Sequence, residues 1–269
     1  MDRKILFIGG GQMAEGIIGG LIRQDVFSPD CIFVSDVVPQ RLAHLQKTYS
    51  VVPAAELTPA ARLADVIFLA VRPQDIAGAC AGLSSILAER KDVLIASIVA
   101  GVDLKTLASH TRPGQKIVRI MPNTLIQAQN GFSAACVNEH VEPEDRKTIQ
   151  AILESLGQVM FLNEEKYDLF TAYSCVGPMY LYLLMHALIQ AGVRTGFSRE
   201  ESYAITIKNT LGSAQMLELT GDHPLQRIDT MTSPGGVTID ALASLEEDAF
   251  VGSVMRSVKA SVDKTLSFK

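Results

Sequence analysis

The chain has 269 residues, of which 48% are hydrophobic and 20% are charged, and its formal net charge at pH 7 is −5. This length allows one large domain or two moderate ones, and the acidic balance argues against nucleic acid or an anionic membrane as the main partner. Four cysteines are scattered without a Cys-x-x-Cys pair. That spacing favours buried, reduced thiols over disulfides or a metal site.

The first residues already show a strand pattern, which begins at Ile5 and leaves no room for a signal peptide. Farther along, the apolar stretch 179–189 is shorter than the ~20 residues that a helix needs to cross a bilayer. We therefore expect a soluble, cytoplasmic protein with no membrane partner.

The first predicted element is a buried strand over residues 5–8, followed by a helix over residues 14–23. A Gly-x-Gly-x-x-Ala motif at residues 9–14 joins the two. Such a motif often occurs by chance, but here a strand precedes it and a helix follows it. This context favours a dinucleotide-binding turn.

Each residue of the motif has a physical role in that interpretation. Gly9 allows the tight turn out of the strand, and Gly11 lets the backbone approach a pyrophosphate that leaves no room for a Cβ atom. Ala14 lets the helix pack close to the strand while the positive helix end holds the diphosphate. Asp36, which lies 22 positions beyond Ala14, completes the pattern.

A second strand is predicted at residues 32–36, followed by a helix over residues 39–47 that opens with proline. Asp36 can accept hydrogen bonds from an adenosine ribose, which favours NAD over NADP. It can equally be an N-cap for the following helix, and Arg41 is close enough in sequence to meet a 2′-phosphate. The choice between NADPH and NADH stays open.

Five more apolar runs continue the alternation of strands and helices, and they predict an α/β fold with a Rossmann-type doubly wound, mainly parallel sheet. They are residues 66–71, 93–98, 117–121, 131–136 and 158–162. Ligands bind beyond the carboxyl ends of the strands in such sheets. Three loops at strand ends, 70–74, 97–101 and 121–124, are therefore expected to contact the coenzyme, although ordinary loops have the same residue types.

Strand patterns vanish after about residue 163, and helical periodicity replaces them. Ala204, Ile207 and Leu211 fall at helical spacing. We therefore divide the chain into a dinucleotide-binding domain, residues 1–162, and an all-helical domain, residues 163–269. The helical domain is small and strongly apolar, which is typical of a surface buried against a second subunit, so a dimer is expected.

The segment 232–239 is the second informative motif, because Thr-Ser-Pro-Gly-Gly-Val-Thr-Ile precedes a predicted helix over residues 240–250. A Pro-Gly-Gly turn ahead of a helix exposes backbone N–H groups at the positive end of the dipole, which suits a carboxylate. Thr238 lies in the first turn and can face that ligand. A simple turn with Thr238 facing solvent is an equal alternative.

No residue pattern indicates a metal site or a strong catalytic acid, base or nucleophile. The five histidines lack metal-ligand spacing, and Gly-x-Ser-x-Gly, paired-carboxylate and His-Glu-x-x-His patterns do not occur. An enzyme with this inventory suits a reaction in which the cofactor supplies the difficult step.

Four segments together resemble the pyrroline-5-carboxylate reductases, and the resemblance covers essentially the whole chain. They are residues 8–15, 68–74, 118–124 and 232–238. The last of them matches the substrate-loop signature of that family. Where the family usually has lysine, this chain has Arg72.

The resemblance implies reduction of a cyclic imine carboxylate, 1-pyrroline-5-carboxylate, to L-proline by hydride from NADPH or NADH. The loop at residues 234–238 would hold the substrate carboxylate through backbone N–H groups, and the Thr238 hydroxyl would hydrogen-bond the ring nitrogen. The resemblance also implies a homodimer interlocked through the helical domains, with active sites near the interface, and in some members a ring of dimers.

The resulting candidate residues fall into two sets. The cofactor-binding set, drawn from the glycine motif and the strand ends, is Gly9, Gly11, Gln12, Met13, Ala14, Ser35, Asp36, Ala70, Val71, Arg72, Pro73, Ala100 and Asn123. The substrate-binding set, in which Thr238 is the catalytic residue, is Ser233, Pro234, Gly235, Gly236, Val237 and Thr238.

One segment departs from the family pattern. Residues 174–180 replace Ser-Gly-Ser-Gly-Pro-Ala-Tyr, and there Cys175 and Val176 make the site bulkier and more apolar, while Leu125 replaces a usual proline. Two other functions therefore stay open beside the imine reductase. One is a dehydrogenase of small hydroxy acids, and the other is a non-catalytic nucleotide-binding homologue.

Overall fold

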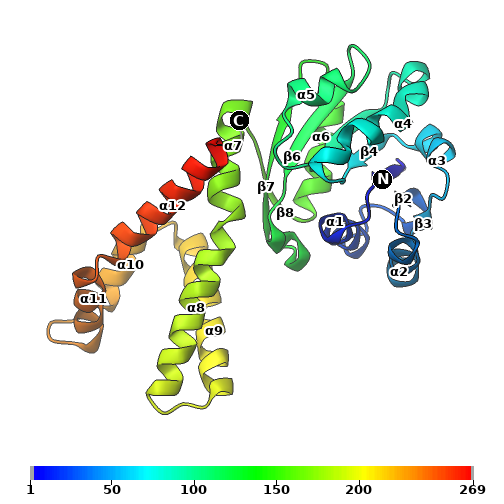
Figure 1. Ribbon diagram of the computed structural model, residues 1–269. Coiled ribbons are helices and arrows are strands. Elements are labelled where there is room, and N and C mark those ends of the chain that lie inside the picture. Colours follow the sequence, from blue (N-terminus) through cyan, green and yellow to red (C-terminus); the bar gives the residue numbers. More distant parts are fainter. Residues whose placement is uncertain (1–2, 268–269) are drawn as a thin grey trace. The chain divides into compact units, whose positions relative to one another are not determined.

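The structure is a computed structural model that describes residues 3–267. Its internal contacts divide the chain into two compact units, which Figure 1 shows with their elements labelled. The first, called unit 1 here, ends at Cys175, and the second, unit 2, is Val176–Ser267. The predicted domain boundary after residue 162 stays a proposal. It marks where strand patterns end in the sequence, whereas the two units are defined by contacts within the chain.

Unit 1 is built on an eight-stranded sheet with the strand order β3-β2-β1-β4-β5-β6-β7-β8. The strands are β1 Ile5–Ile8, β2 Ile32–Ser35, β3 Val52–Pro53, β4 Val66–Leu69, β5 Leu94–Ser97, β6 Lys116–Met121, β7 Gly131–Val137 and β8 Gly157–Phe161. All neighbouring strands run parallel except β6 and β7. The predicted doubly wound, mainly parallel sheet is confirmed. The two-residue strand β3 was not predicted, since so short a segment with a proline has no strand pattern.

Helices cover both faces of this sheet, which explains why the strands are apolar at successive positions. Ile5 and Phe7 belong to one buried cluster, together with residues of α1, α2 and α6. Leu6 and Ile8 belong to the other, together with residues of α3, α4 and α5. The helices are α1 Gln12–Arg23, α2 Pro39–Tyr49, α3 Leu57–Leu63, α4 Ile76–Glu89, α5 Leu104–Ser109 and α6 Pro143–Glu154.

A nearly continuous helical stretch follows the sheet. Helix α7, Glu164–Phe170, leads through a π-helical turn, Thr171–Cys175, into α8, Gly177–Arg194. Within residues 3–267, this stretch of 31 residues is the one long and apolar enough, by length and composition, to cross a membrane. The apolar run predicted at residues 179–189 is therefore part of a longer helix than expected. A helix that packs against a second protein chain meets the same criteria.

Unit 2 contains only helices among its described residues: α8, α9 Arg199–Thr220, α10 Pro224–Met231, α11 Val237–Glu247 and α12 Phe250–Leu266. A Cβ atom on Gly192 would lie 2.6 Å from Ser202 Oγ, so α8 and α9 approach each other closely there. The prediction of a helix over residues 240–250 was wrong about where the helix ends. Helix α11 stops at Glu247, and Ala249, with a φ of 50°, separates it from α12.

Candidate functional site

The carboxyl ends of the parallel strands of unit 1 form one level edge. Ile8 is in register with Ser35 on β2 and with Leu69 on β4. Leu69 pairs with Ser97 on β5, which in turn pairs with Arg119 on β6. The loops after β1, β2, β4 and β5 therefore begin side by side, and β6 continues two residues farther, to Met121, before its loop begins. The structure thus brings together the strand-end segments that the sequence analysis predicted for coenzyme contact.

The glycine turn after β1 requires glycine for two different reasons. Gly9 has a φ of 99°, and a Cβ atom there would lie 2.4 Å from the carbonyl oxygen of Ala70. Gly11, in contrast, has no protein atom within 4 Å of its Cβ position apart from those of its chain neighbours. It is also the N-cap of α1 and has no side chain to cap the helix. The first turn of α1 therefore points uncapped N–H groups toward open space, which fits a diphosphate.

Asp36 follows β2 and is tied to the glycine turn. Its Oδ2 accepts a hydrogen bond from the Gly10 N–H at 2.6 Å, and its Oδ1 accepts one from the Val38 N–H at 2.8 Å. The alternative prediction, an N-cap for the next helix, does not hold, because Val38 is the N-cap of α2. The carboxylate instead closes the turn before that helix and lies beside the glycine motif.

Arg41 is engaged by groups of the protein itself. Its Nε donates to the Gly10 carbonyl oxygen at 2.5 Å, and its Nη2 forms an ion pair with Glu15. Glu15 also contacts His44 Nε2 at 2.9 Å and accepts a hydrogen bond from the Tyr49 hydroxyl at 3.3 Å. We call these four residues the Glu15 network. Burial raises the pKa of Glu15, but the hydrogen bonds from Arg41 and His44 outweigh it and leave the pKa below its ordinary value.

Glu15 is not among the site residues predicted from the sequence. The available signal was weak: an acidic residue directly after the glycine motif, and Arg41 and His44 three positions apart on one face of α2. Only the packing of α1 against α2 shows that these groups meet.

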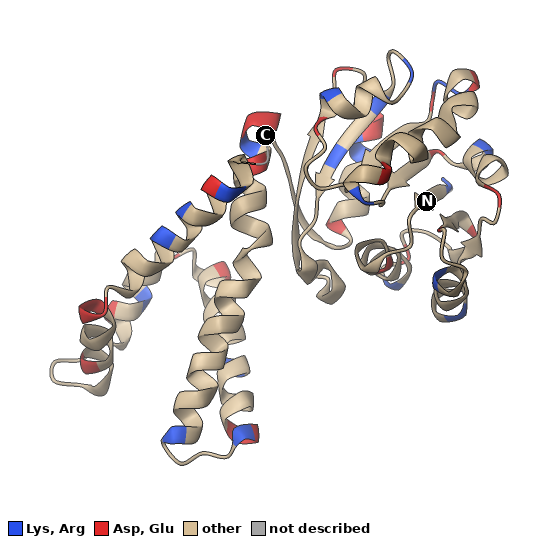
Figure 2. Ribbon diagram, in the orientation of Figure 1, with Lys and Arg blue, Asp and Glu red and all other residues tan. Residues whose placement is uncertain are grey.

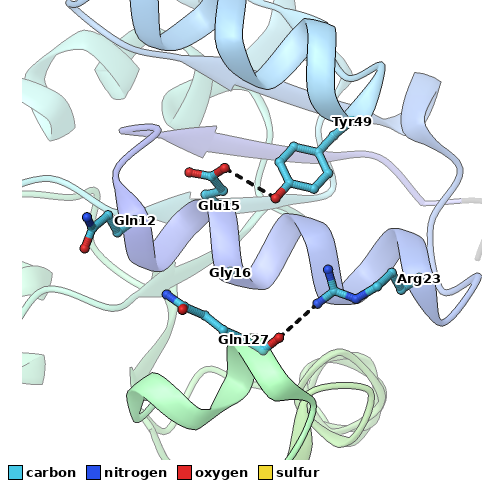
Figure 3. A pocket seen from close by; sticks show the side chains of 6 residues that line it. All are labelled: Gln12, Glu15, Gly16, Arg23, Tyr49 and Gln127. Atoms are coloured by element: carbon cyan, nitrogen blue, oxygen red, sulfur yellow. Dashed lines mark hydrogen bonds between the residues drawn. The ribbon is translucent and has the colours of Figure 1, made fainter. Parts of the chain in front are cut away.

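An open pocket of about 410 Å³ lies beside α1, and Figure 3 shows the side chains that line it. Its lining residues are Gln12, Glu15, Gly16, Arg23, Tyr49 and Gln127. Arg23 closes one side by donating to the carbonyl oxygen of Gln127 at 3.4 Å. Of the predicted cofactor residues, only Gln12 lines this pocket, so it adjoins the predicted coenzyme groove without coinciding with it.

The remaining candidates for cofactor contact differ in exposure. Ala70 and Val71 are half-buried, while Arg72 is exposed and its Nε donates to Asp75 at 2.8 Å. Ala100 is exposed at the end of the β5 loop. These positions leave backbone and short side chains at the strand edge, which is the kind of surface that a planar ring system can approach.

Asn123 is buried, and its side chain serves the loop. Its Oδ1 accepts hydrogen bonds from the Leu125 N–H at 3.2 Å and the Phe132 N–H at 3.4 Å. Asn123 is also the N-cap of the short 3₁₀ helix η3, Thr124–Ala128. Its amide oxygen therefore shapes the loop after β6, and any contact with a ligand falls to the rest of the residue.

A buried cluster fixes α7 to the sheet. The Arg119 side chain, in β6, forms an ion pair with Glu164 at 3.0 Å and lies 4.1 Å from the ring centre of Tyr167. Tyr167 is fully buried, and burial raises its pKa, so its hydroxyl stays neutral. Arg119 is not among the site residues predicted from the sequence, where it belongs only to the segment 118–124 that resembles the family. A charged residue inside an apolar strand run was the signal for this role.

Cys175 lies at the end of the π-helical turn, and its thiol reaches the loop before Asn123. Its Sγ donates to the carbonyl oxygen of Pro122 at 3.8 Å. Burial raises the pKa of this thiol to about 11, so it is neutral at physiological pH. The Cys175 side chain, which departs from the family pattern, therefore contacts the loop that contains Asn123, a predicted cofactor residue.

The loop 232–238 lies wholly in unit 2. Gly235 has a φ of 68°, and the Gly236 N–H donates to the Ser233 carbonyl oxygen at 3.0 Å, which closes the turn. Gly236 is the N-cap of α11 and provides no side-chain cap. Thr238 is half-buried at the second position of α11. The turn thus ends in an uncapped helix N-terminus, which can bind a carboxylate.

The comparison with family models first defines the class. A model described as NADP oxidoreductase, coenzyme F420-dependent, matches residues 4–101. Together with the glycine turn and the level strand edge, this match defines a nucleotide-dependent oxidoreductase of the Rossmann type. A second model, described as pyrroline-5-carboxylate reductase dimerisation, matches residues 164–267.

Similar proteins narrow the class to a family. A pyrroline-5-carboxylate reductase from Synechocystis sp. is 34% identical over 261 residues, which are 97% of this chain and 96% of the relative. The structure of a pyrroline-5-carboxylate reductase from Coxiella burnetii matches with a TM-score of 0.92 at 30% identity. The match covers 100% of this chain and 99% of the Coxiella chain. The structure of a pyrroline carboxylate reductase from Plasmodium falciparum with NADP bound matches with a TM-score of 0.88 at 29% identity. The match covers 99% of this chain and 98% of the Plasmodium chain. The chain belongs to the pyrroline-5-carboxylate reductase family.

Proposed function

We propose that this protein reduces 1-pyrroline-5-carboxylate to L-proline with hydride from NADPH or NADH. Family membership over nearly the whole chain supports this reaction. The observation that carries the proposal is the uncapped N-terminus of α11, which follows the Pro-Gly-Gly turn and has Thr238 in its first turn. A small anion such as a carboxylate is the kind of ligand that such a helix end binds.

Unit 1 supplies the binding site for the coenzyme, whose nicotinamide provides the hydride when bound. Gly11 and the first turn of α1 hold the diphosphate, because their N–H groups are free and no side chain blocks the approach. Ser35 and Asp36 lie on the adenosine side, at the end of β2. The loops after β4, β5 and β6 contribute Ala70, Ala100 and Asn123 to the other side.

Unit 2 supplies the substrate loop. The backbone N–H groups after Gly236 bind the carboxylate of the substrate, and the Thr238 hydroxyl accepts a hydrogen bond from the ring nitrogen. A neutral imine accepts hydride poorly, so the ring reacts as the iminium. The hydride forms a new C–H bond, the C=N π bond breaks, and its electron pair stays on nitrogen. The Thr238 hydroxyl stays hydrogen-bonded to the ring nitrogen while that nitrogen becomes the amine of proline.

A homodimer formed through unit 2 belongs to the same proposal. The dimerisation match at residues 164–267 supports it, and so do the exposed apolar side chains of α8. A ring of dimers, cytoplasmic location and the absence of nucleic-acid or membrane partners stay predictions. Light scattering of the purified protein measures the number of subunits directly.

A turnover assay with 1-pyrroline-5-carboxylate and each nicotinamide coenzyme, run beside a coenzyme titration, tests the function. We expect proline formation with at least one coenzyme. Coenzyme binding without any turnover would instead support the non-catalytic homologue, which the Cys175-Val176 segment motivates. Turnover of small hydroxy acids without proline formation would support the dehydrogenase.

A further inference from the structure

We propose that this enzyme prefers NADH to NADPH, and that Asp36 and the Glu15 network together set that preference. The inference rests on the proposed function, because it concerns the coenzyme of the same reaction. It goes beyond that function by assigning coenzyme choice to specific residues of this chain.

The first observation is the fixed position of Asp36. Both of its carboxylate oxygens are held, at 2.6 Å by the Gly10 N–H and at 2.8 Å by the Val38 N–H. The residue follows β2 directly at the carboxyl edge of the sheet. In Rossmann-type folds this is where an acidic side chain meets the adenosine ribose. Each carboxylate oxygen has a second lone pair, so Asp36 can still accept hydrogen bonds from ribose hydroxyls.

The second observation is the charge that an NADPH phosphate would meet. A phosphate monoester has about −1.5 to −2 charges at neutral pH, and on the ribose 2′ position it would approach the Asp36 carboxylate. A nearby cation would have to compensate for this repulsion. Arg41 is the basic residue that follows Asp36 most closely in sequence. Whether its guanidinium is available decides whether a 2′-phosphate finds a compensating cation.

Arg41 does not offer a free cation. Its Nε donates to the Gly10 carbonyl oxygen at 2.5 Å, and its Nη2 is paired with Glu15. Figure 3 shows Glu15 on α1 turned toward Tyr49 of α2, whose hydroxyl it also binds. The lowered pKa of Glu15 keeps this carboxylate charged at neutral pH. Asp36, Glu15 and Arg41 therefore have a net charge of −1, which repels a 2′-phosphate and leaves ribose hydroxyls unaffected.

The test is direct titration of the full-length protein with NADH and with NADPH, followed by nicotinamide fluorescence or calorimetry. We expect the dissociation constant of the wild type to be at least ~10-fold lower for NADH, because the like charge weakens only NADPH binding and solvent and salt screen part of the repulsion. Asp36→Asn keeps the shape of the side chain and removes its charge. It should shift the ratio toward NADPH by about 10-fold, mainly through tighter NADPH binding.

Glu15→Gln tests the second part of the inference, because it frees Arg41 for the phosphate. It should tighten NADPH binding severalfold and leave NADH binding nearly unchanged. Asp30→Asn is the matched control, because Asp30 lies before β2 and Asp36 lies after it. This variant should change neither constant. Thermal unfolding of each variant shows that the fold is retained.

Two results would overturn the inference. One is a wild-type protein that binds NADPH as tightly as NADH, or more tightly. The other is an Asp36→Asn variant that weakens both coenzymes equally, since Asp36 would then only shape the glycine turn. If instead NADH binds selectively but 1-pyrroline-5-carboxylate is not turned over, the coenzyme inference holds and the proposed function fails. The two are thus separable.

Discussion

Units 1 and 2 differ in how far their large apolar side chains are buried. In unit 1, Phe7 and Phe68 are fully buried and their rings stack with centres 4.9 Å apart. In unit 2, many large apolar side chains of the described residues are exposed, and Leu183 of α8 is 63% exposed. Figure 2 shows that α8 is nearly free of charged residues along its length. An apolar and uncharged helix surface of this kind is normally covered by a partner.

The buried positions of unit 2 make the contrast sharper. Ser202 and Thr206 of α9 are buried, at 3% and 5% exposure, while Leu211 farther along the same helix is exposed. Small polar residues thus form the contact within the chain, and the larger apolar ones are left for a contact with another chain. Unit 1 has a complete core of its own, whereas unit 2 leaves large apolar side chains exposed, and we expect a second copy of the chain to cover them. The match of residues 164–267 to a dimerisation model agrees with this division.

The largest expected effect comes from placing a charge on the apolar surface of unit 2. Leu183→Glu should abolish the dimer, because a buried unpaired carboxylate costs several kcal/mol. Leu63→Glu is the matched control, since Leu63 is an exposed leucine on α3 of unit 1, and it should leave the assembly unchanged. Light scattering gives the answer. A wild-type folded species near 29.1 kDa at micromolar concentration would contradict the whole comparison.

Thr238→Ala tests whether unit 2 contributes to the chemistry as well as to assembly. We expect kcat/KM to fall by roughly 10²–10³-fold, because one preorganised hydrogen bond at the reacting nitrogen is lost. Coenzyme binding, which belongs to unit 1, should not change. Thr238→Ser keeps the hydroxyl and should recover most of the activity. An unchanged kcat/KM in the alanine variant would remove Thr238 from the mechanism.

Two glycine substitutions separate stability from binding within unit 1. Gly9→Ala should lower the free energy of unfolding by at least ~2 kcal/mol, because its positive φ and the nearby Ala70 carbonyl leave no room. Gly11→Ala should change stability by less than ~0.5 kcal/mol and yet weaken coenzyme binding. Chemical denaturation and coenzyme titration measure the two effects. Equal destabilisation by both substitutions would show that Gly11 is not a binding position.

The junction between the two units offers a smaller effect. Cys175→Gly combined with Val176→Ser restores the family's residues at these two positions, and we expect it to raise kcat/KM for 1-pyrroline-5-carboxylate. Val176 lacks a hydroxyl that could satisfy a buried polar group, a loss of ~1–3 kcal/mol where that group stays buried. Steady-state kinetics on a protein shown by circular dichroism to be folded checks this. Flat kinetics would assign the segment a purely structural role.

The smallest expected effect concerns pH and unit 1. The pKa of Glu15 is lowered in the folded state, so its contribution to stability is present above its unfolded pKa and is lost as pH falls through the folded value. The ion pair is partly exposed, so roughly 0.5 kcal/mol is at stake. Denaturation curves at pH 7 and pH 3 should therefore differ less for Glu15→Gln than for the wild type. An identical pH dependence in both would assign the acid sensitivity to other carboxylates.

The sequence by itself determined the features that depend on neighbours along the chain. Apolar runs such as the one at Ile5–Ile8 predict strands because a strand buried on both faces has no polar positions. The glycine motif and the Pro-Gly-Gly turn predict their sites because φ values and helix ends are local properties. The sheet, the glycine turn and the Pro-Gly-Gly turn ahead of α11 could therefore be predicted without coordinates, while carboxylate binding by that turn stays a prediction.

Tertiary structure alone decided the features that join residues far apart in sequence. Arg41 looked free to bind a phosphate, but Glu15, 26 positions earlier, occupies it. Asp36 was predicted equally as a helix cap, and its hydrogen bond to Gly10, also 26 positions earlier, shows a different role. The break at Ala249 between α11 and α12 also escaped the helical pattern. Periodicity describes which face of an element is apolar, whereas the partner of a charged side chain depends on how the elements pack.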